Sequence, residues 1–268
     1  MEQVEKGSFF GSHYQKSIVN EIILTDTEYT HNKVDWHQHE NPYFTYILQG
    51  KLYEASHSHE HYLESGGLLY HNWQDSHFNL KPEIYTRGFH VELSPQWFSH
   101  QDVSLDCIEG NHLIQNPVIK SLMTQVFIES KINDLHSQIS IDALMTDILS
   151  LLTTQENSAL QKRPSWFNRL NEIIVDSSVK LSLNNLSHLL NIHPVHLSRE
   201  FHKYFGTTFG QYIRYKRVNK AFNLILNSHY SLTEICYECD YYDQSHLIRD
   251  FKRIFNQTPG QLIKHIKK

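Results

Sequence analysis

Hydrophobic and polar residues follow two different periods along the 268-residue chain. Up to about residue 93, short aromatic and β-branched stretches alternate with turn residues; the clearest are Tyr43–Ser56, which Gly50 interrupts, Gly66–Trp73 and Ile84–Leu93. Closely spaced stretches of this kind are typical of the strands of an all-β sandwich or barrel. From Asn116 onward the apolar residues recur at a helical period. The pattern predicts a β-rich amino-terminal part followed by helices.

Capping residues mark the change of pattern. Ser94 before Pro95 indicates a helix start, since Ser is a favoured N-cap and Pro suits the first helical position. The two longer helices that follow have apolar stripes, formed by Val118, Leu122, Val126 and Phe127 and by Ile141, Leu144, Ile148 and Leu152. Such a stripe covers the β-rich core or meets a second copy of the chain, so a homodimer is one expectation. The polar stretch Thr153–Ser165 is interpreted as a linker, which places domains at residues 1–160 and 161–268.

The helical part contains a duplicated unit. HLSREFHKYFGTTFGQYI (residues 196–213) and HLIRDFKRIFNQTPGQLI (246–263) are identical at nine of 18 positions, at an offset of 50. Each copy is preceded by a short helix with a capping Ser, at Ser182 or Ser231, and by a turn at Asn191 or Asp240. Two helices joined by a tight turn form the helix-turn-helix arrangement, so the repeat predicts two such units.

The second helix of each unit has one apolar and one polar face. Leu197, Phe201 and Phe205, and Leu247, Phe251 and Phe255, are expected to be buried. The other face carries Val195, His196, Ser198, Arg199 and His202 in the first unit and Gln244, Ser245, Arg249 and Lys252 in the second. Arg, Gln, Ser and His can hydrogen-bond base edges, and Val can contact thymine methyl groups. We expect these residues to bind double-stranded DNA; the alternative is an ordinary solvated helix face.

A predicted helix from Thr208 to Asn227 joins the two units. About 20 residues at a rise of ~1.5 Å span ~30 Å, close to the ~34 Å of one turn of B-DNA. A spacer of that length would hold the two recognition helices in successive major grooves. The basic residues on it are candidate phosphate contacts: Arg214, Lys216, Arg217 and Lys220.

The distribution of charge supports this division. Residues 1–165 carry 10 basic against 21 acidic side chains, a net charge of −11, whereas residues 166–268 carry 14 against 8, a net charge of +6. This asymmetry suggests an acidic module fused to one that binds a polyanion. The sparse cysteines, Cys107, Cys236 and Cys239, argue against a disulfide-stapled secreted fold. With no signal peptide in MEQVEKGSFF and no apolar run of ~20 residues, a cytoplasmic protein without a membrane partner is expected.

Residues 182–263 resemble the DNA-binding domain of AraC/XylS-type bacterial transcription regulators. The resemblance rests on LSREFHKYFG, GQYIRYKRVNKA and YYDQSHLIRDFKRIFNQTPGQ. It implies an α+β protein: an amino-terminal cupin-like β-barrel with flanking helices, then an all-α double helix-turn-helix domain. It also implies a non-enzymatic regulator that binds a small-molecule effector and contacts the transcription machinery. The chain departs from the family pattern at Cys236, Asp240 and Asn256, the last two where the family favours Gly.

The amino-terminal half resembles the family's sensor domain, and histidines carry this resemblance. WHQHENPYFTYILQG and NWQDSH resemble the two cupin motifs, but Tyr43 and Phe44 stand near the place of the usual Glu. The resemblance implies an effector pocket without a resident metal or other cofactor, because related sensor cupins are mostly metal-free. Its predicted lining is Trp36, His37, His39, Tyr46, Trp73 and His77, aromatic rings with a few polar groups.

Two alternatives to this interpretation remain. A divalent metal bound by His37, His39 and His77 would make the chain a metal-dependent cupin enzyme or a metal sensor fused to a DNA-binding domain. Alternatively, the cupin serves only as a dimerisation scaffold. The other clusters are weaker candidates for a functional site. His57, His59 and His61 fall at a predicted hairpin tip, and the pair Cys236 and Cys239 lies inside a predicted helix.

Overall fold

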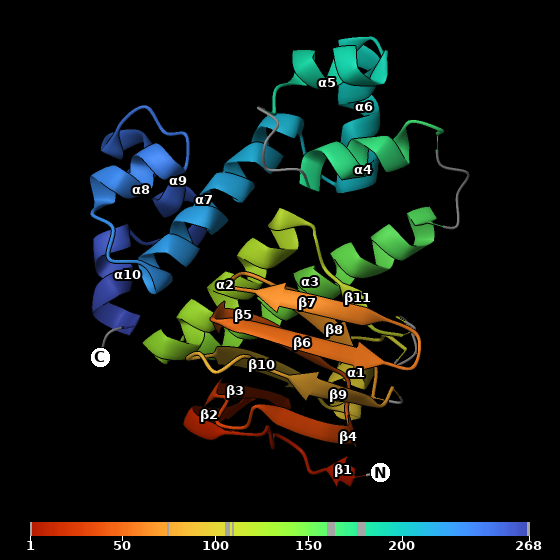
Figure 1. Cartoon of the computed structure of the whole chain (residues 1–268), viewed down its shortest axis with the longest axis vertical. Coiled ribbons are helices and arrows are strands. Elements are labelled where there is room, and N and C mark those ends of the chain that lie inside the picture. Colours follow the sequence, from red (N-terminus) through yellow and green to blue (C-terminus); the bar gives the residue numbers. More distant parts are fainter. Residues whose placement is uncertain are drawn as a thin grey trace.

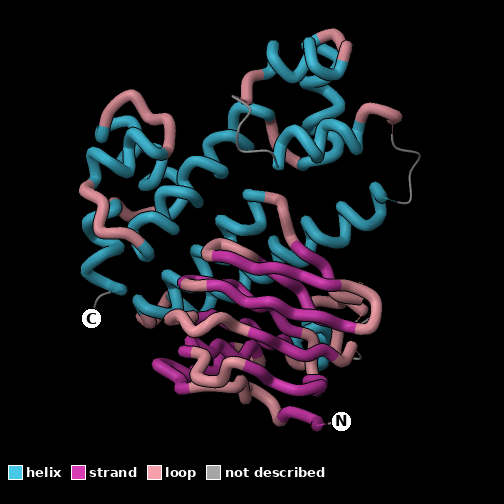
Figure 2. Tube along the Cα trace, in the orientation of Figure 1, coloured by secondary structure: helices cyan, strands magenta, loops and turns pink. Residues whose placement is uncertain are grey.

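The computed structural model describes residues 2–73, 75–104, 108, 110–159, 164–175 and 181–266. Strands form one end of the molecule and helices the other, with the carboxy-terminal helices above the sheets in Figure 1 and in the trace of Figure 2. The predicted α+β fold is therefore confirmed. None of the described helices is long and apolar enough to cross a membrane.

One sheet has six strands in the order β11-β8-β5-β10-β3-β2, with antiparallel neighbours. Its members are β2 (Ser12–Val19), β3 (Ile22–Glu28), β5 (Tyr43–Gln49), β8 (Leu68–His71), β10 (Arg87–Leu93) and β11 (His112–Leu113). Gly50 separates β5 from the next strand at φ 80°, a conformation that glycine adopts without strain.

The other sheet has five strands in the order β1-β4-β9-β6-β7. They are β1 (Glu2–Val4), β4 (Lys33–His39), β6 (Lys51–Ser56), β7 (Glu60–Glu64) and β9 (His77–Leu80). Only β1 is parallel to its neighbour, with Val4 opposite His39. The two sheets are separate hydrogen-bonded units, so they form a cupin-like sandwich and not the closed barrel that was expected.

Strand β5 is buried on both faces, which shows how the layers stack. Ile47 packs with Leu52, Leu63 and Leu69 between the sheets. Phe44, Tyr46 and Leu48 belong to a second cluster, which contains the helices outside the six-stranded sheet. Since successive side chains of a strand alternate between its faces, one strand contributes to both cores.

Three helices pack against the strands: α1 (Pro95–His100), α2 (Pro117–Ile132) and α3 (Ser137–Ala159). Ser94 caps α1 and Pro95 occupies its first turn, as predicted. The apolar stripes of α2 and α3 belong largely to the main core. Helix α3 includes residues 153–159, so the first half of the predicted linker is wrong. Residues 160–163, where the domain boundary was placed, lie outside the described ranges, as does Cys107.

The remaining helices are α4 (Phe167–Val175), α5 (Leu183–Leu190), α6 (Pro194–Phe205), α7 (Phe209–Asn227), α8 (Leu232–Glu238), α9 (Gln244–Phe255) and α10 (Pro259–Ile266). The two predicted helix-turn-helix units are α5–α6 and α8–α9. Asn191 and Asp240 take the left-handed conformation at φ 52° and 56°. Capping boxes at Thr208 and Ser231 are formed as the sequence predicts.

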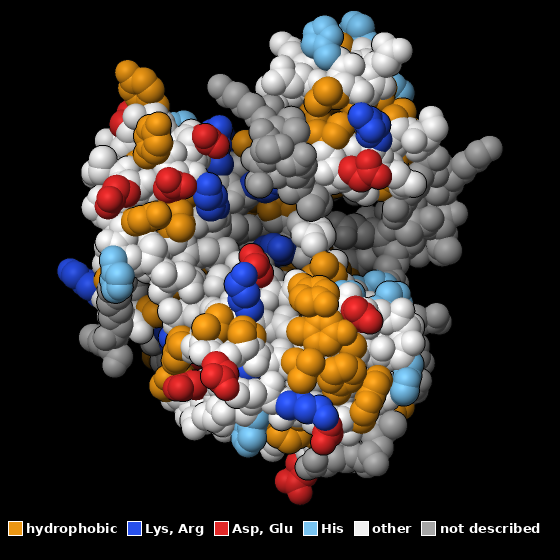
Figure 3. Space-filling model, in the orientation of Figure 1, with side chains coloured by type: hydrophobic (Ala, Val, Ile, Leu, Met, Phe, Trp, Pro, Cys, Tyr) orange, Lys and Arg blue, Asp and Glu red, His pale blue; other side chains and the backbone are white. Residues whose placement is uncertain are grey.

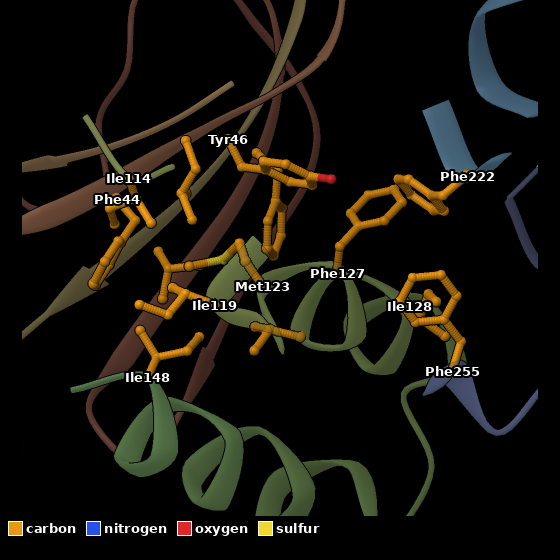
Figure 4. Close-up of a cluster of buried hydrophobic side chains, with 14 of the residues drawn as sticks. Phe44, Tyr46, Ile114, Ile119, Met123, Phe127, Ile128, Ile148, Phe222 and Phe255 are labelled. Atoms are coloured by element: carbon orange, nitrogen blue, oxygen red, sulfur yellow. The ribbon is translucent and has the colours of Figure 1, made fainter. Parts of the chain in front are cut away.

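The two units are packed differently. Helices α4, α5 and α6 form a core of their own with Tyr212 of α7. Helices α8, α9 and α10 instead share the main core with the six-stranded sheet, α2 and α3. Figure 4 shows Phe127 of α2 and Phe222 of α7 together within this cluster, with Phe255 of α9 nearby. The second unit is thus part of the same hydrophobic core as the amino-terminal domain.

Candidate functional site

The predicted recognition faces are open to solvent on both units. On α6 the exposed residues are Val195, His196, Ser198, Arg199 and His202, and on α9 they are Gln244, Ser245, Arg249 and Lys252, with His246 half-buried beside them. The opposite faces are buried through Leu197, Phe201, Leu247 and Phe251. The repeat therefore predicted the orientation of both helices correctly.

A shallow groove runs along α9. Ser245, Ile248, Arg249, Lys252 and Arg253 line it, so three cations and one hydroxyl surround an aliphatic floor. Asp243 caps the helix by accepting from the amide of His246 at 2.7 Å. This composition suits a nucleic acid, since the cations can bind phosphates or guanine edges and the aliphatic group can contact a thymine methyl.

All four predicted phosphate contacts on α7 are engaged within the protein. Nζ of Lys216 donates to the carbonyl of Ile174 at 2.6 Å, and Nζ of Lys220 donates to the carbonyl of Glu238. Arg214 lies 3.1 Å (Nε–Oδ1) from Asp250, which also lies 3.5 Å from Nε2 of His246. The Arg217 guanidinium sits 5.9 Å above the ring of Tyr241. Arg214 and Arg217 thus join α7 to the second unit, and Asp250 holds Arg214 rather than Arg249. The sequence could not show the Arg214–Asp250 and Arg217–Tyr241 contacts, because the partners are far apart along the chain.

Three of the amino-terminal candidates, His37, His39 and His77, come together. His37, His39 and His77 are all buried, and each offers a nitrogen within 4.8 Å of the others. His37 and His39 line a cavity between the sheets, and the His77 ring lies behind them, 4.3 Å from that of His37. Burial lowers the pKa of His77 to about 3 and that of His39 well below its usual value, so both rings are neutral at pH 7.

The hydrogen bonds of two of these rings fix their tautomers. Nδ1 of His37 lies 2.8 Å from the carbonyl of Asp35, and Nδ1 of His77 lies 3.2 Å from that of Asp75. A carbonyl only accepts, so both nitrogens donate, and a neutral ring then carries its lone pair on Nε2. In His77 this atom is 2.9 Å from the hydroxyl of Tyr43. Metal-binding histidines commonly have this arrangement, so these residues fit a divalent ion.

Three other predicted lining residues lie elsewhere. The Trp36 ring stacks on His57 at 4.4 Å and contacts Phe78 on the outer face of the five-stranded sheet, where Figure 3 shows hydrophobic side chains gathered. Tyr46 points away from the cavity and hydrogen-bonds Thr124 of α2 at 2.9 Å. Trp73 follows β8 and does not line the cavity. Neighbours of opposite parity in a strand face opposite sides, which the sequence pattern did not resolve.

Buried polar residues that sequence reasoning missed surround the histidines. Glu54 lies 3.2 Å from Nδ1 of His71 and is buried, which raises the pKa of its carboxyl well above the ordinary value. Nε2 of His71 lies 3.0 Å from the hydroxyl of Thr45. His90 of β10 hydrogen-bonds Tyr29 at 2.7 Å, and burial lowers the pKa of His90 to about 3. A signal was available, since Glu54 and His90 interrupt otherwise apolar strands.

The cysteine pair is structural. Cys236 and Cys239 are free and buried within the main core. Burial raises the pKa of both thiols, that of Cys239 to about 12. A thiol is inert when it stays protonated, so the C-x-x-C spacing serves packing here.

Comparisons with known proteins agree with the helical half. A family model described as a helix-turn-helix domain matches residues 186–265. The chain is 32% identical over 81 residues to the uncharacterized HTH-type transcriptional regulator YpdC of Escherichia coli K12, which covers 30% of this chain and 28% of that protein. It is 29% identical over 175 residues to the HTH-type transcriptional activator RhaS of Escherichia coli O139:H28, which covers 64% and 59%. This chain thus spans less than two thirds of either relative.

Among solved structures, an apo variant of ToxT from Vibrio cholerae aligns over 93% of this chain and 99% of its own, at 10% identity and a TM-score of 0.39.

Proposed function

Because residues 186–265 match a helix-turn-helix family model, we propose that the chain is an AraC/XylS-type transcription regulator and binds a specific double-stranded DNA sequence through α6 and α9. The observation that carries this proposal is the duplicated helix whose polar face is exposed in both copies. Helix α7, 19 residues long, separates the two and extends about 28 Å at ~1.5 Å per residue. That length matches readers placed in successive major grooves of one DNA face.

We further propose that a small molecule bound between the two sheets controls DNA binding. Support comes from the contacts that join the amino-terminal domain to α7. Ser121 of α2 donates to Oδ1 of Asn219 at 2.7 Å, and Nδ2 of Asn219 donates to the carbonyl of Pro117 at 2.9 Å. Tyr46 of β5 reaches the same helix α2 through Thr124. A shift of β5 on effector binding would therefore move α2 and, with it, α7.

The remaining expectations are part of the same proposal. A cytoplasmic, non-enzymatic regulator that acts as a homodimer and contacts the transcription machinery agrees with the regulatory relatives. Exposed apolar residues at the start of α3 support self-association: Leu135 is 93% and Ile139 71% exposed. The proposal also keeps the predicted domain boundary between residues 160 and 161.

Selection from a random DNA pool tests base reading. The wild-type chain, Arg199→Ala and Arg249→Ala would each select preferred sites. If both arginines contact guanine, each variant loses preference at one position, the two about one helical turn apart. Arg169→Ala on α4 is a matched control, since it removes an exposed guanidinium that belongs to neither recognition helix. Identical preferred sites for all four proteins would rule out base reading by these arginines.

A second candidate function is metal sensing, favoured by the convergence of His37, His39 and His77 and by the tautomers described above. These three imidazoles would hold a divalent ion such as Zn²⁺. Zn²⁺ titration of untagged protein followed by elemental analysis tests this idea. One ion per chain, lost in His39→Ala but kept in the exposed control His57→Ala, would support it, and an absence of bound metal would exclude it.

A further inference from the structure

The segment before β2 enters the sandwich. After β1, the amide of Gly7 donates to the carboxylate of Glu92 at 2.7 Å, and Nδ2 of Asn41 binds the other oxygen at 2.7 Å. Gly7 has φ 64°, and a Cβ there would lie 2.7 Å from Ile23 and Lys16. This position therefore requires glycine, and the anchored backbone directs the next residues into the cavity.

The ring of Phe9 is held between flat groups. It is stacked on the imidazole of His90 with centroids 3.7 Å apart and an interplanar angle of 6°. His39 stacks on it at 5.0 Å and 24°, and Tyr43 meets it edge-on at 5.3 Å. Phe9 is 8% exposed, although its partners are two histidines and a tyrosine rather than the aliphatic residues of an ordinary core. The arrangement is a slot for a planar aromatic ring.

Phe9 also determines how much room an effector has. The cavity that it lines with Phe10, His37 and His39 retains about 30 Å³, far less than the roughly 150 Å³ of an apolar cavity that binds benzene. A small-molecule effector therefore fits only after the Phe9 ring has left. Nδ1 of His39 is buried without a hydrogen-bond partner, so the vacated slot would also offer a polar group.

From this geometry we infer that the amino-terminal domain binds a planar aromatic molecule with a hydrogen-bonding substituent, and that Phe9 occupies its place in the free protein. This inference rests on the proposed control by a small molecule and names the class of that molecule. Binding would expel Phe9 and strain the Gly7–Glu92 hydrogen bond, so the amino-terminal segment would report occupancy of the slot.

Phenol and cyclohexanol are suitable probes, because they share a hydroxyl and a similar size while only phenol is planar. Calorimetry would compare full-length wild type, Phe9→Ala and Phe10→Ala in buffer with a chelator, which removes metal effects. Truncating a buried side chain leaves a cavity that a molecule of similar shape can fill. We expect Phe9→Ala to bind phenol at least about ten-fold more tightly than either other protein, and cyclohexanol at least about ten-fold more weakly than phenol.

Phe10→Ala is the matched control, since Phe10 touches His37 edge-on at 4.9 Å outside the stacked slot. Equal phenol affinity in all three proteins, or equal affinity of Phe9→Ala for the two probes, would overturn the inference. If Phe9→Ala fails to fold, Phe9→Val keeps a small apolar side chain at the anchored segment but still vacates the place of the ring, and the same two comparisons decide. Phenol binding is measured without DNA, so its failure is distinguishable from a failure of Arg199→Ala to change site selection.

Discussion

Asp26 of β3 is a buried carboxylate shared by two cations. Arg87 of β10 donates to both of its oxygens, at 2.7 Å from Nε and 2.6 Å from Nη2, and Lys131 at the end of α2 pairs with one of them. Gln15 of β2 accepts from Lys131 at 2.8 Å. Asp26 is 1% exposed in its side chain, so this cluster fastens α2 to the edge of the six-stranded sheet.

Arg87→Ala should lower the free energy of unfolding by about 3 kcal/mol, because it leaves the Asp26 carboxylate buried with a single cation. Urea denaturation measures the loss. The control is Lys33→Ala, which removes a cation from the exposed ion pair with Asp35 and should cost less than about 1 kcal/mol. Equal losses in the two variants would contradict this view.

The same cluster sets a pH dependence. Burial favours protonation of Asp26, but the hydrogen bonds and charges of Arg87 and Lys131 outweigh it and hold the pKa below its usual value. The stabilisation is therefore fully present above the unfolded pKa of about 3.9 and is lost as the pH falls through the folded pKa. We expect wild type to lose stability below about pH 4 by this route, and Asp26→Asn to show a shallower acid slope in denaturation midpoints.

At the level of single residues, the sequence predicted the exposed arginines better than the cavity. Arg199 and Arg249 precede buried phenylalanines by two positions, which fixes their outward direction on a helix. Tyr46 was misplaced because β5 is buried on both faces, so its residues show no alternation between polar and apolar. Trp36 was misplaced because it lies on β4 next to His37 and therefore faces the opposite side of the sheet. Phe9 gave no signal, since its role depends on a long-range contact with His90.

At the level of elements, the helices were predictable from capping residues and from the repeat. The prediction ended helix α3 too early because the last turns of the helix carry no apolar stripe. In the structure, the hydroxyls of Thr153 and Thr154 donate to the carbonyls of Leu149 and Ser150 within the helix. Strand β7 was missed because Glu60 and Glu64 at its two ends are charged and exposed, although it forms a local hairpin with β6 in which Ala55 lies opposite Glu60.

The turn between α8 and α9 allows a test at this scale. Asp240 is exposed at φ 56°, where an L-residue is strained and glycine is not. Asp240→Gly should leave the melting temperature unchanged or raise it slightly, whereas Asp240→Val should cost about 1–2 kcal/mol. Calorimetric melting compares the two variants. Asp243→Val is unsuitable as a control, because Asp243 caps α9. A stabilising Val would contradict the left-handed turn.

At the scale of the whole molecule, one recognition unit is continuous with the sensor and the other is not. Asn219 lies at this junction and is 8% exposed. Asn219→Ala leaves the hydroxyl of Ser121 buried without its acceptor and removes the side-chain donor to the carbonyl of Pro117, at a cost of about 1–3 kcal/mol. Urea denaturation measures the cost, with the exposed neighbour Lys220→Ala as control. Equal effects of the two substitutions would exclude a special role for Asn219.

Charge acts at the same scale. Five cations are exposed on the two recognition helices: Arg199, Lys203, Arg249, Lys252 and Arg253. Each phosphate that they neutralise contributes about −0.9 to the slope of log K against log salt. Fluorescence anisotropy with the full chain should give a slope between about −3 and −5, and Lys252→Ala should reduce its magnitude by about 1 if Lys252 binds phosphate. A slope near zero would contradict DNA binding by these faces.

The unequal packing of the two units bears on how the chain can be altered. Helices α4 to α6 keep their own core, so substitutions within it need not disturb the packing of the amino-terminal domain. Helices α8 to α10 share a core with α2, so a larger or smaller side chain on either surface alters the packing of the other. If α6 and α9 bind DNA as proposed, the half of the target that α6 contacts can be changed independently of the amino-terminal domain, whereas the half that α9 contacts cannot.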